Sequence, residues 1–393
     1  MGFYKRSYKR LSFCHKYVTI LMKIDKYKNH LANSIMLTLV FSLLFTSCLD
    51  NALVQPIEFR THNSEDILYY LESIGDFPNS LDAPGLVGAG NVFYHINEYL
   101  IIDVRSEEQF MAGHIMSAVN ISHDNLLDYI ENITVNSYNK IVIVSTTGQA
   151  ACYYTALLRF CHYENVFALK YGMASWNMYF AAPWLNATKS SIMLNSFNSV
   201  TQRKNPYTLL PTIDIDSYES ITETIKSRVR ILLEDEFIDF GVRDISCSAS
   251  ITLDVLYENY ISSSEGFANY YPVCLGTNDL YYASMSSLES NGHPPTAVLI
   301  KALSPFFEMR SNKYLQTMPI DKTLALYCFN GNLSACFTAY LRLLGYDAKS
   351  ILFGYNTFNY PRMLTFPVFE EYTFNNAQIH NYPYVTGNSL QEK

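Results

Sequence analysis

A strand, a short loop and a helix follow one another at two places in this chain of 393 residues, and this repeat restricts the fold more than any other feature. In both copies the strand is a short apolar run, and the helix carries apolar residues on one face at 3.6-residue spacing. Strands that lead through loops into helices favour parallel sheets covered by helices. We therefore predict an α/β protein built from two related units. In the order strand, loop and helix, these units are 141–144, 145–149 and 150–161, and 323–327, 328–332 and 333–344.

The two copies also share residues at matching positions around the loop, which supports a true internal repeat. Ser145 opens the first loop where Cys328 opens the second, and Gly148 matches Gly331. Further landmarks recur in the same order along the chain, namely Gly113-His114 with Gly292-His293 and Gly172 with Gly354.

Cys328 is the residue of the repeat with the most informative chemistry. It lies between a strand and the N-terminus of a helix, where unpaired backbone N–H groups and the helix dipole favour a thiolate and a bound anion. We predict that the loop amides form a cradle for an anion, with Gly331 permitting the tight turn. The alternative is that Cys328 is only a small buried apolar residue at a strand end. The residues of the predicted cradle are Phe329, Asn330, Gly331, Asn332 and Leu333.

The first half of the chain resembles a rhodanese domain. The resemblance rests on the segment 99–105 with Asp103 and Arg105, on Gly113-His114, on the loop at Ser145, and on Gly172-Met173 followed by Trp176. A weaker copy covers a similar length of the second half, so the chain is similar to tandem sulfurtransferases of the thiosulfate or mercaptopyruvate type. The resemblance implies two α/β domains, each a mainly parallel sheet flanked by helices. In that family the amino-terminal copy commonly lacks the reactive cysteine, which the carboxy-terminal copy keeps.

The resemblance implies that Cys328 is the catalytic nucleophile of a sulfurtransferase and carries sulfane sulfur as a persulfide. Such an enzyme has a sulfane-sulfur donor and a thiol acceptor as its partners. Ser145 cannot replace the cysteine, because its hydroxyl stays protonated and no general base is evident beside it in the sequence. The second loop lacks the cations that receive an anionic donor in active members. The alternative is a rhodanese-like scaffold that binds a protein partner and has no turnover.

In the first half, we expect Ser145, Gly148, Asp103 and Arg105 to mark a degenerate site. Without a nucleophile nearby, Asp103 and Arg105 are expected to form a structural ion pair at a strand end. A rhodanese-fold phosphatase is another candidate class, and its loop ends in an arginine that binds phosphate. The first arginine after Cys328 is Arg342, well inside the helix, and so this chain does not fit that class.

The amino terminus indicates export from the cytoplasm. Lysines precede an apolar run at 34–45, which is shorter than the roughly 20 residues that a spanning helix needs. The run ends at Thr46-Ser47-Cys48 and resembles a bacterial lipoprotein signal, so we expect residues 1–47 to be removed and Cys48 to carry a lipid. This implies a lipid-anchored membrane protein of the cell envelope, outside the cytoplasm. Cleavage without a lipid and an uncleaved anchor are the alternatives, and Met22 is an alternative start.

Composition narrows the classes of function and suggests the domain boundaries. A net charge of −8 argues against nucleic-acid binding. The cysteines lack metal-ligand spacing, so we expect neither a metal nor another cofactor, and Cys247 with Cys274 is the disulfide we expect in an oxidising compartment. The length after the signal suggests two domains with cores of their own. The predicted boundaries are a signal peptide at 1–47, a first domain at 55–190, a linker at 191–220, a second domain at 221–365 and an unassigned tail at 366–393.

Overall fold

Each copy of the repeated unit lies at the centre of a five-stranded sheet in which all paired strands are parallel. The structure, a computed structural model, describes residues 62–189, 191–213, 220–240, 246–264, 266–282, 292–365 and 367–387. The strand order is β1-β5-β4-β2-β3 in the first sheet and β6-β10-β9-β7-β8 in the second, so the two sheets have the same topology. The predicted α/β class, with mainly parallel sheets flanked by helices, is confirmed.

The first half of the molecule runs from α3 to η5. Its strands are β1 (Leu86–Val87), β2 (Tyr99–Asp103), β3 (Val119–Asn120), β4 (Lys140–Val144) and β5 (Val166–Leu169). Its α-helices are α3 (Ser64–Ser73), α4 (Ala89–Tyr94), α5 (Glu107–Ala112), α6 (Leu126–Glu131), α7 (Gln149–Phe160), α8 (Met173–Trp176) and α9 (Ala182–Ala187). Its 3₁₀ turns are η1 (Phe77–Asn79), η2 (His123–Asn125), η3 (Val135–Ser137), η4 (Met178–Phe180) and η5 (Ile192–Ser196).

The second half runs from β6 to η8, and α10 (Ile221–Glu234) precedes it. Its strands are β6 (Ser250–Ile251), β7 (Tyr270–Leu275), β8 (Val298–Ile300), β9 (Thr323–Tyr327) and β10 (Ala348–Ile351). Its helices and 3₁₀ turns are α11 (Leu253–Ser262), α12 (Asn278–Tyr281), η6 (Leu315–Thr317), α13 (Asn332–Leu343), α14 (Tyr355–Phe358), α15 (Tyr360–Thr365), η7 (Pro367–Tyr372) and η8 (Asn376–Gln378).

The central strands form because their residues suit a position covered on both faces. In β4 and in β9, every residue after the first is buried. Continuous apolar runs of this kind are typical of parallel strands with helices on both sides. Each of the two strands ends at the loop that the sequence singled out, so both loops lie at the carboxyl edge of their sheets.

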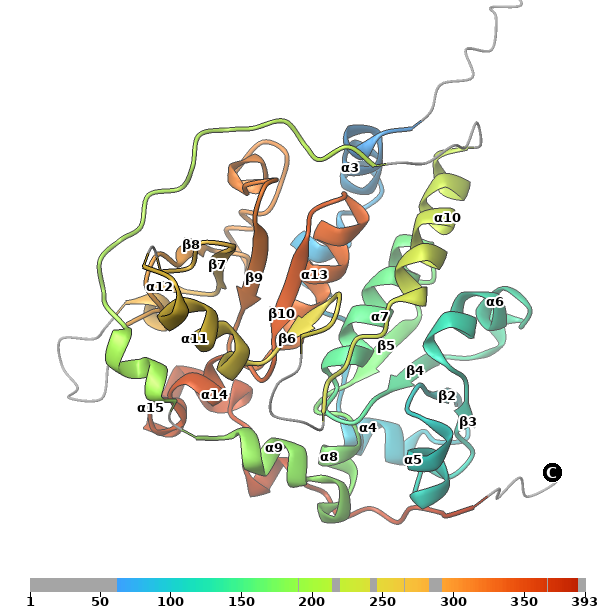
Figure 1. Ribbon diagram of the computed structural model, residues 1–393. Coiled ribbons are helices and arrows are strands. Elements are labelled where there is room, and N and C mark those ends of the chain that lie inside the picture. The colour runs from blue at the N-terminus through green and yellow to red at the C-terminus, as the bar shows by residue number, and fades with distance from the viewer. Residues whose placement is uncertain are drawn as a thin grey trace, which may run out of the picture. The chain divides into compact units, whose positions relative to one another are not determined.

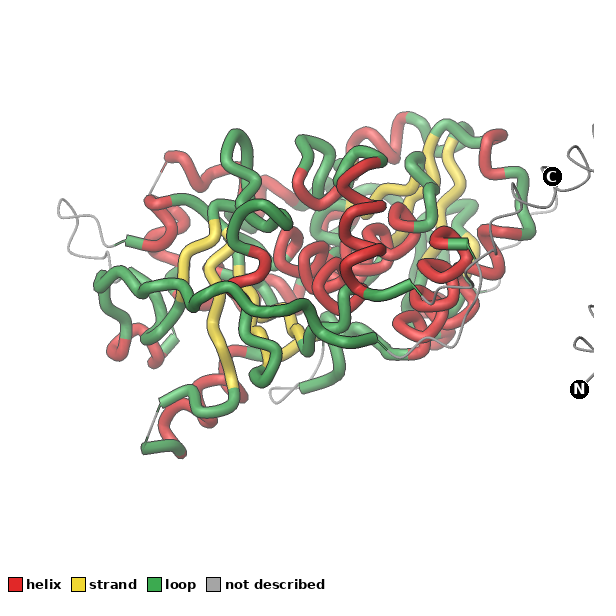
Figure 2. Tube along the Cα trace, turned by 90° about the horizontal axis from the view of Figure 1, so that it is seen from above, coloured by secondary structure: helices red, strands yellow, loops and turns green. Residues whose placement is uncertain are grey.

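The helices that follow the two loops pack against each other and join the halves of the molecule. Helices α7 and α13 lie side by side between the sheets (Figure 1), and Figure 2 shows two groups of strands with helices between them. Almost all of the residues in both helices are buried. The largest hydrophobic cluster contains residues of both halves, while two further clusters belong mainly to one half each. The halves therefore share a core, in addition to the separate cores expected from the sequence.

The connection between the halves includes α10, which the sequence assigned to the second domain. Ion pairs join it to α6 of the first half, with Arg230 Nε 3.2 Å from an Asp128 oxygen and Lys226 Nζ 2.9 Å from a Glu131 oxygen. On its other side, the Arg228 side chain donates a hydrogen bond of 3.0 Å to the Arg342 carbonyl oxygen in α13. Helix α10 therefore contacts both halves, and it positions the segment that follows it.

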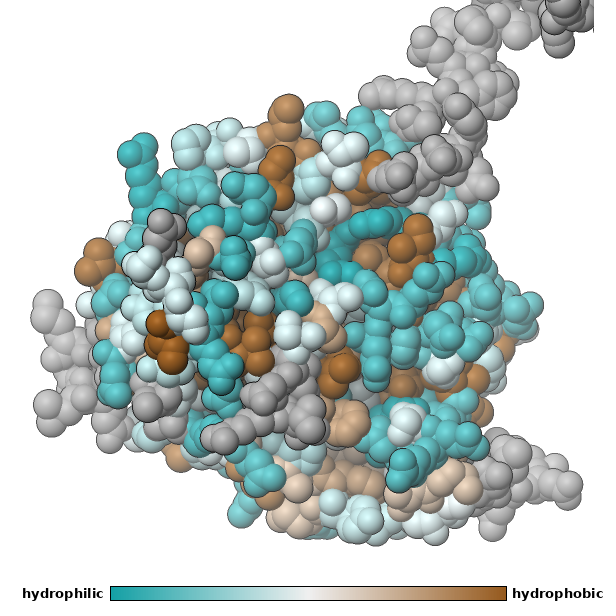
Figure 3. Space-filling model, viewed as in Figure 1, coloured by the Kyte–Doolittle hydropathy of each residue, from teal (hydrophilic) through white to brown (hydrophobic). Residues whose placement is uncertain are grey.

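The surface and the amino terminus bear on the predicted membrane anchor. On the face drawn in Figure 3, hydrophobic residues lie in small groups between hydrophilic ones. No helix in the described ranges has the length and apolar character needed to cross a bilayer. The predicted signal at 1–47, Cys48 and the alternative start at Met22 lie outside the described residues.

Candidate functional site

The two loops have the same backbone conformation. Gly148 and Gly331 have φ angles of 87° and 85°, in the left-handed region that favours glycine. Each loop is closed by a second glycine that packs on its first residue. A Cβ atom at Gly172 would lie 2.3 Å from the Ser145 carbonyl oxygen, and one at Gly354 would lie 2.4 Å from that of Cys328. These glycines explain why the landmarks recur in the sequence.

In the first loop, backbone amides converge on the Ser145 side chain, in the manner that the sequence predicted for Cys328. Ser145 Oγ accepts hydrogen bonds from the N–H groups of Gly148, at 3.0 Å, and Ala151, at 3.2 Å. It donates a hydrogen bond of 2.8 Å to a carboxylate oxygen of Asp239. The expectation that Ser145 has no basic group beside it was wrong, because the Asp239 carboxylate contacts its hydroxyl.

Asp239 fills the anion position of the first loop. Its Oδ2 atom also accepts hydrogen bonds from Thr147 N at 3.1 Å, Thr147 Oγ1 at 2.9 Å and Ala150 N at 3.3 Å. Asp239 and Ser145 are both buried. Burial raises the pKa of the Asp239 carboxyl, and the hydrogen bonds from Ser145 and Thr147 oppose that rise. The amides at the start of α7 therefore bind a carboxylate of the protein itself.

In the second loop, the Cys328 sulfur is enclosed and its neighbours are oxygen atoms. Only 1% of Cys328 is exposed. Its thiol faces Ser334 Oγ at 3.7 Å and Asn330 Oδ1 at 4.0 Å. Among the described residues, no loop N–H group donates a hydrogen bond to the sulfur, so the predicted convergence of amides on Cys328 is not seen. Instead, the Asn332 N–H at the start of α13 donates to Asn330 Oδ1 at 3.3 Å.

The other residues of the second loop are buried under aromatic side chains and the first half. The Phe329 ring stacks on Tyr372, with centroids 4.5 Å apart, and contacts Phe369. The Phe329 carbonyl oxygen accepts a hydrogen bond of 2.9 Å from the Asn356 side chain. The exposed fractions of the loop side chains are 3% for Phe329, 4% for Asn330, 1% for Asn332 and 7% for Leu333.

A side chain from the first half closes the space beside Gly331. Gln149, the first residue of α7, accepts a hydrogen bond of 2.7 Å from Phe353 N through its Oε1 atom. A Cβ atom at Gly331 would lie only 2.0 Å from this same oxygen. The Tyr171 hydroxyl, also from the first half, donates a hydrogen bond of 3.2 Å to the Glu371 carbonyl oxygen, next to Tyr372. The two loops thus face one another through short contacts.

The remaining predicted residues of the degenerate site form an ion pair. Arg105 Nη2 lies 2.6 Å from an Asp103 oxygen, both residues are buried, and Arg105 also donates to the Gly113 carbonyl oxygen at 2.8 Å. Asp103 pairs in register with Val144, the residue before Ser145. In the second sheet, Cys274 pairs in the same way with Tyr327, the residue before Cys328. Cys274 therefore occupies the position of Asp103, which explains why no second Asp and Arg pair was found.

Arg342 and the other cysteines lie away from the second loop's anion position. Arg342, in the last turn of α13, lies 2.5 Å from an Asp235 oxygen and donates to the Ser248 carbonyl oxygen at 2.5 Å. The expected disulfide is absent, because Cys247 and Cys274 are both free thiols. Cys247 contacts Ser250, whereas Cys274 is buried near the carboxyl end of β7.

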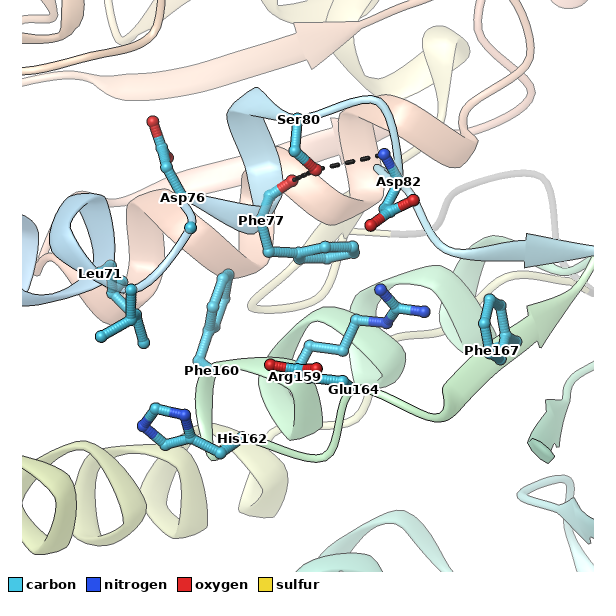
Figure 4. A pocket seen from close by; sticks show the side chains of 12 residues that line it. Leu71, Asp76, Phe77, Ser80, Asp82, Arg159, Phe160, His162, Glu164 and Phe167 are labelled. Atoms are coloured by element: carbon cyan, nitrogen blue, oxygen red, sulfur yellow. Dashed lines mark hydrogen bonds between the residues drawn. The ribbon is translucent and has the colours of Figure 1, made fainter. Parts of the chain in front are cut away.

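An open cavity of about 320 Å³ lies at the far end of α7 from the first loop (Figure 4). The Arg159 guanidinium group lies between the rings of Phe77 and Phe167, 4.6 Å from the centroid of each. Because α7 has 12 residues, at 1.5 Å per residue its two ends are roughly 18 Å apart. The residues that line this cavity are Leu71, Ile74, Gly75, Asp76, Phe77, Ser80, Asp82, Arg159, Phe160, His162, Glu164 and Phe167, and none was a predicted site residue.

Comparison with known families decides how the first half is classified. The family model described as a rhodanese-like domain matches residues 93–179. Over these residues the chain is similar to rhodanese-like domains. It contains the Asp103 and Arg105 pair, the first loop and the closing glycine at Gly172. Within the described residues, no three side chains of the kinds that bind metals come together around this domain or elsewhere.

Solved structures of rhodanese-like proteins resemble parts of the chain. The rhodanese-related protein of Thermoplasma volcanium is 20% identical and covers 23% of this chain and 89% of its own, with a TM-score of 0.22. The rhodanese-like domain from Anabaena is 24% identical and covers 23% of this chain and 70% of its own, with a TM-score of 0.21. The thiosulfate sulfurtransferase of Pseudomonas aeruginosa is 11% identical and covers 80% of this chain and 69% of its own, with a TM-score of 0.22. No curated protein matches the chain.

Sequence reasoning missed Asp239, which dominates the first loop. A signal was present, since Asp239 stands between apolar residues in the run Phe237-Ile238-Asp239-Phe240. A carboxylate in such a run must be bound by donors when the run is buried. The sequence could not show which donors, because Ser145 lies 94 residues earlier.

Proposed function

We propose that this protein is a tandem rhodanese-like protein that binds a partner and does not transfer sulfur. One observation carries the proposal: each loop is closed to an external anion. In the first loop, Asp239 Oδ2 accepts the amides of Thr147 and Ala150, and in the second loop Cys328 is only 1% exposed and its sulfur faces Asn330 Oδ1 and Ser334 Oγ. This is the binding or scaffold alternative of the sequence analysis.

The sulfurtransferase hypothesis requires a reactive, accessible Cys328. A persulfide forms when a thiolate attacks a sulfane sulfur, and the donor must approach the attacking sulfur. With 1% of Cys328 exposed, the Phe329 ring stacked on Tyr372 and Gln149 against Gly331, a donor has no room to approach. Loop N–H groups would also be needed to stabilise a persulfide anion. Among the described residues, none of them donates a hydrogen bond to the Cys328 sulfur. Cys336 offers no second thiol, because burial raises its pKa to about 12.

Sulfur transfer to cyanide tests the proposal. The purified protein is incubated with thiosulfate or 3-mercaptopyruvate and cyanide, and thiocyanate is followed over time. We expect the same background rate for the wild type, for Cys328→Ser and for Cys336→Ser, which serves as a matched control at another buried thiol. Turnover by the wild type and Cys336→Ser that is lost in Cys328→Ser would disprove the proposal and establish Cys328 as the nucleophile.

We also propose that the protein is anchored to the cell envelope through a lipid on Cys48. The support is the apolar run at 34–45 followed by small residues and a cysteine. Membrane fractionation of cells that express the wild type or Cys48→Ala tests this proposal. The wild type should remain with the membrane after a high-salt wash, and Cys48→Ala should be released. Equal retention of both proteins would argue for an uncleaved anchor instead.

A further inference from the structure

Residues 380–387, here called the C-terminal strap, run along one edge of the first half, with a left-handed turn at Asn381, whose φ is 54°. Figure 1 shows this part of the chain passing beside α8 and α5 at the lower edge of the view. The preceding residues anchor it, because Phe374 and Ile379 are buried in a cluster with Trp184. The strap belongs to the tail that the sequence left unassigned, and it reaches the first half from the end of the second.

Main-chain hydrogen bonds hold the strap over its whole length. Two of these bonds join the same pair of residues: His114 N donates to Val385 O at 2.9 Å, and Val385 N donates to His114 O at 3.0 Å. The other bonds to the strap backbone are His380 N to Ser175 O at 3.0 Å, Tyr382 N to Trp176 O at 2.8 Å, Gly387 N to Met111 O at 2.9 Å, Trp176 Nε1 to Pro383 O at 2.8 Å and Asn177 Nδ2 to Tyr382 O at 2.9 Å. Bonds of this kind do not depend on the side chains of the bound segment.

Two tyrosines of the strap fit aromatic sites on the first half. The Tyr382 ring stacks on Phe93, with centroids 4.1 Å apart and planes within 1° of parallel. The Tyr384 ring meets the Phe180 ring edge to face at 5.0 Å and lies 5.5 Å from the Tyr179 ring. Residues two apart in an extended segment point to the same side, so both tyrosines face the domain. The spacing of these two sites therefore selects a segment with aromatic residues at alternate positions.

The strap lies on the surface, as a bound peptide does. Tyr382, Tyr384 and Val385 are half-buried, while His380, Asn381, Pro383 and Thr386 are exposed. A strand of the core would instead be buried on both faces, like β4. The strap thus contributes little to the shared core, and another segment could take its place without disturbing either sheet.

We propose that the groove formed by Phe93, His114, Trp176, Tyr179 and Phe180 is a peptide-binding site, and that the strap is its ligand within the same chain. The partner it fits is an extended peptide with aromatic residues two positions apart, held mainly through its backbone. This inference rests on the proposed function, because it gives the first rhodanese-like domain a binding role in place of catalysis. The strap belongs to neither sheet, and it is held by an isolated antiparallel bridge at His114 and by bonds to α8 and α5.

A synthetic peptide with the sequence of residues 379–387 and an N-terminal fluorophore tests the proposal by fluorescence anisotropy. A tethered ligand competes at an effective concentration of roughly millimolar, so the full chain should bind the peptide at least about tenfold more weakly than a variant that ends at Ile379. A peptide with alanine at both tyrosine positions should not bind the truncated variant. If the truncated protein keeps its native circular dichroism and does not bind the wild-type peptide, the groove is not a peptide site.

A full-length variant keeps the test decisive if truncation prevents folding. The double substitution Tyr382→Ala and Tyr384→Ala leaves the chain complete and loosens the strap, so this protein should bind the peptide more tightly than the wild type does. A folded double variant that binds no better than the wild type would overturn the proposal.

Two glycines provide a matched pair of groove variants. A Cβ atom at Gly113 would lie 2.7 Å from Phe180 Cζ and 2.8 Å from Tyr384 Cδ2, so Gly113→Ala should block the Tyr384 site. A Cβ atom at Gly90 would make an ordinary contact of 3.4 Å with the Tyr382 hydroxyl. In the truncated chain, Gly113→Ala should weaken peptide binding at least about tenfold, which corresponds to about 1.4 kcal/mol of binding free energy. In the same chain, Gly90→Ala should leave peptide binding unchanged. Equal binding by both variants would place the peptide elsewhere.

The outcomes separate this inference from the proposed function. Sulfur transfer that depends on Cys328 would remove the proposed function whether or not the peptide binds. Absence of both sulfur transfer and peptide binding would leave a protein without turnover whose strap is only a structural part of the fold.

Discussion

Replacing Asp239 with alanine should destabilise the protein far more than replacing it with asparagine. Four hydrogen bonds end on Asp239 Oδ2, from the hydroxyls of Ser145 and Thr147 and from the N–H groups of Thr147 and Ala150. In Asp239→Ala the two hydroxyls can rotate toward other acceptors, but the two amides are fixed by the backbone. Each buried donor left without an acceptor costs about 1–3 kcal/mol, so for the two amides we expect a loss of about 2–6 kcal/mol in the free energy of unfolding.

Asparagine keeps an oxygen in the same place and removes the charge. Burial raises the pKa of Asp239 despite its hydrogen bonds, which means that the ionised form is costly in this position. Asp239→Asn weakens the hydrogen bonds, which no longer end on a charge, but it also removes the cost of burying that charge. Because these two effects offset each other, the free energy of unfolding should change by less than about 1 kcal/mol.

Urea unfolding followed by tryptophan fluorescence measures this difference. Both tryptophans, Trp176 and Trp184, are buried in the first half, and Trp184 Nε1 donates to the Thr147 carbonyl oxygen at 2.9 Å, within the loop itself. The signal therefore reports on the loop directly. If Asp239→Ala unfolds within about 1 kcal/mol of the wild type, the carboxylate does not satisfy the loop amides and the reasoning is refuted. Equal destabilisation by alanine and asparagine would show that the charge, and not the acceptor oxygen, is what matters.

Further predictions concern pH, the contact between the halves and the thiols. Folding raises the pKa of Asp239 above its ordinary value of 3.8, so protonated Asp239 stabilises the fold below pH 3.8, and this stabilisation is lost as pH rises through the folded pKa. The urea midpoint of the wild type should therefore fall relative to that of Asp239→Asn as pH rises between 3.8 and the folded pKa. Parallel curves for the two proteins would contradict this. Arg342→Met should cost about 1–3 kcal/mol in urea unfolding, because it leaves the buried Tyr153 hydroxyl without its hydrogen-bond partner, whereas Arg230→Met, at an exposed ion pair, should cost less than about 1 kcal/mol; similar losses would refute a special role for Arg342. Alkylation followed by peptide mapping should modify the partly exposed Cys247 first and Cys328 only on unfolding, and rapid native alkylation of Cys328 would show that its loop opens.

The centre of each sheet could be predicted from the sequence because its determinants are local. The strand 323–327 was expected and is β9, since a continuous apolar run, a loop and an amphipathic helix lie within one stretch of chain. The glycines at Gly148 and Gly331 mark the same left-handed turn in both halves. Local residues with restricted conformations leave a direct trace in the sequence.

The state of the second loop could not be predicted, because contacts distant in sequence decide it. The helix N-terminus at Cys328 suggested an anion cradle, yet Gln149 of the first half closes the space beside Gly331. Gln149 also accepts a hydrogen bond from Phe353 N, which lies 204 positions later in the chain. The C-terminal strap is a similar case, since an Asn- and Tyr-rich tail shows no sign of the groove it occupies.

Intact mass measurement after exposure to a sulfur donor shows whether Cys328 can carry sulfur, because it detects a single sulfur atom on the protein without requiring turnover. The folded protein and its Cys328→Ser variant are incubated with a polysulfide, with thiosulfate and with 3-mercaptopyruvate, and then desalted. We predict that none of the three donors adds mass that depends on Cys328. A gain of one sulfur atom in the wild type, missing from Cys328→Ser and removed by cyanide, would contradict it and identify a persulfide carrier.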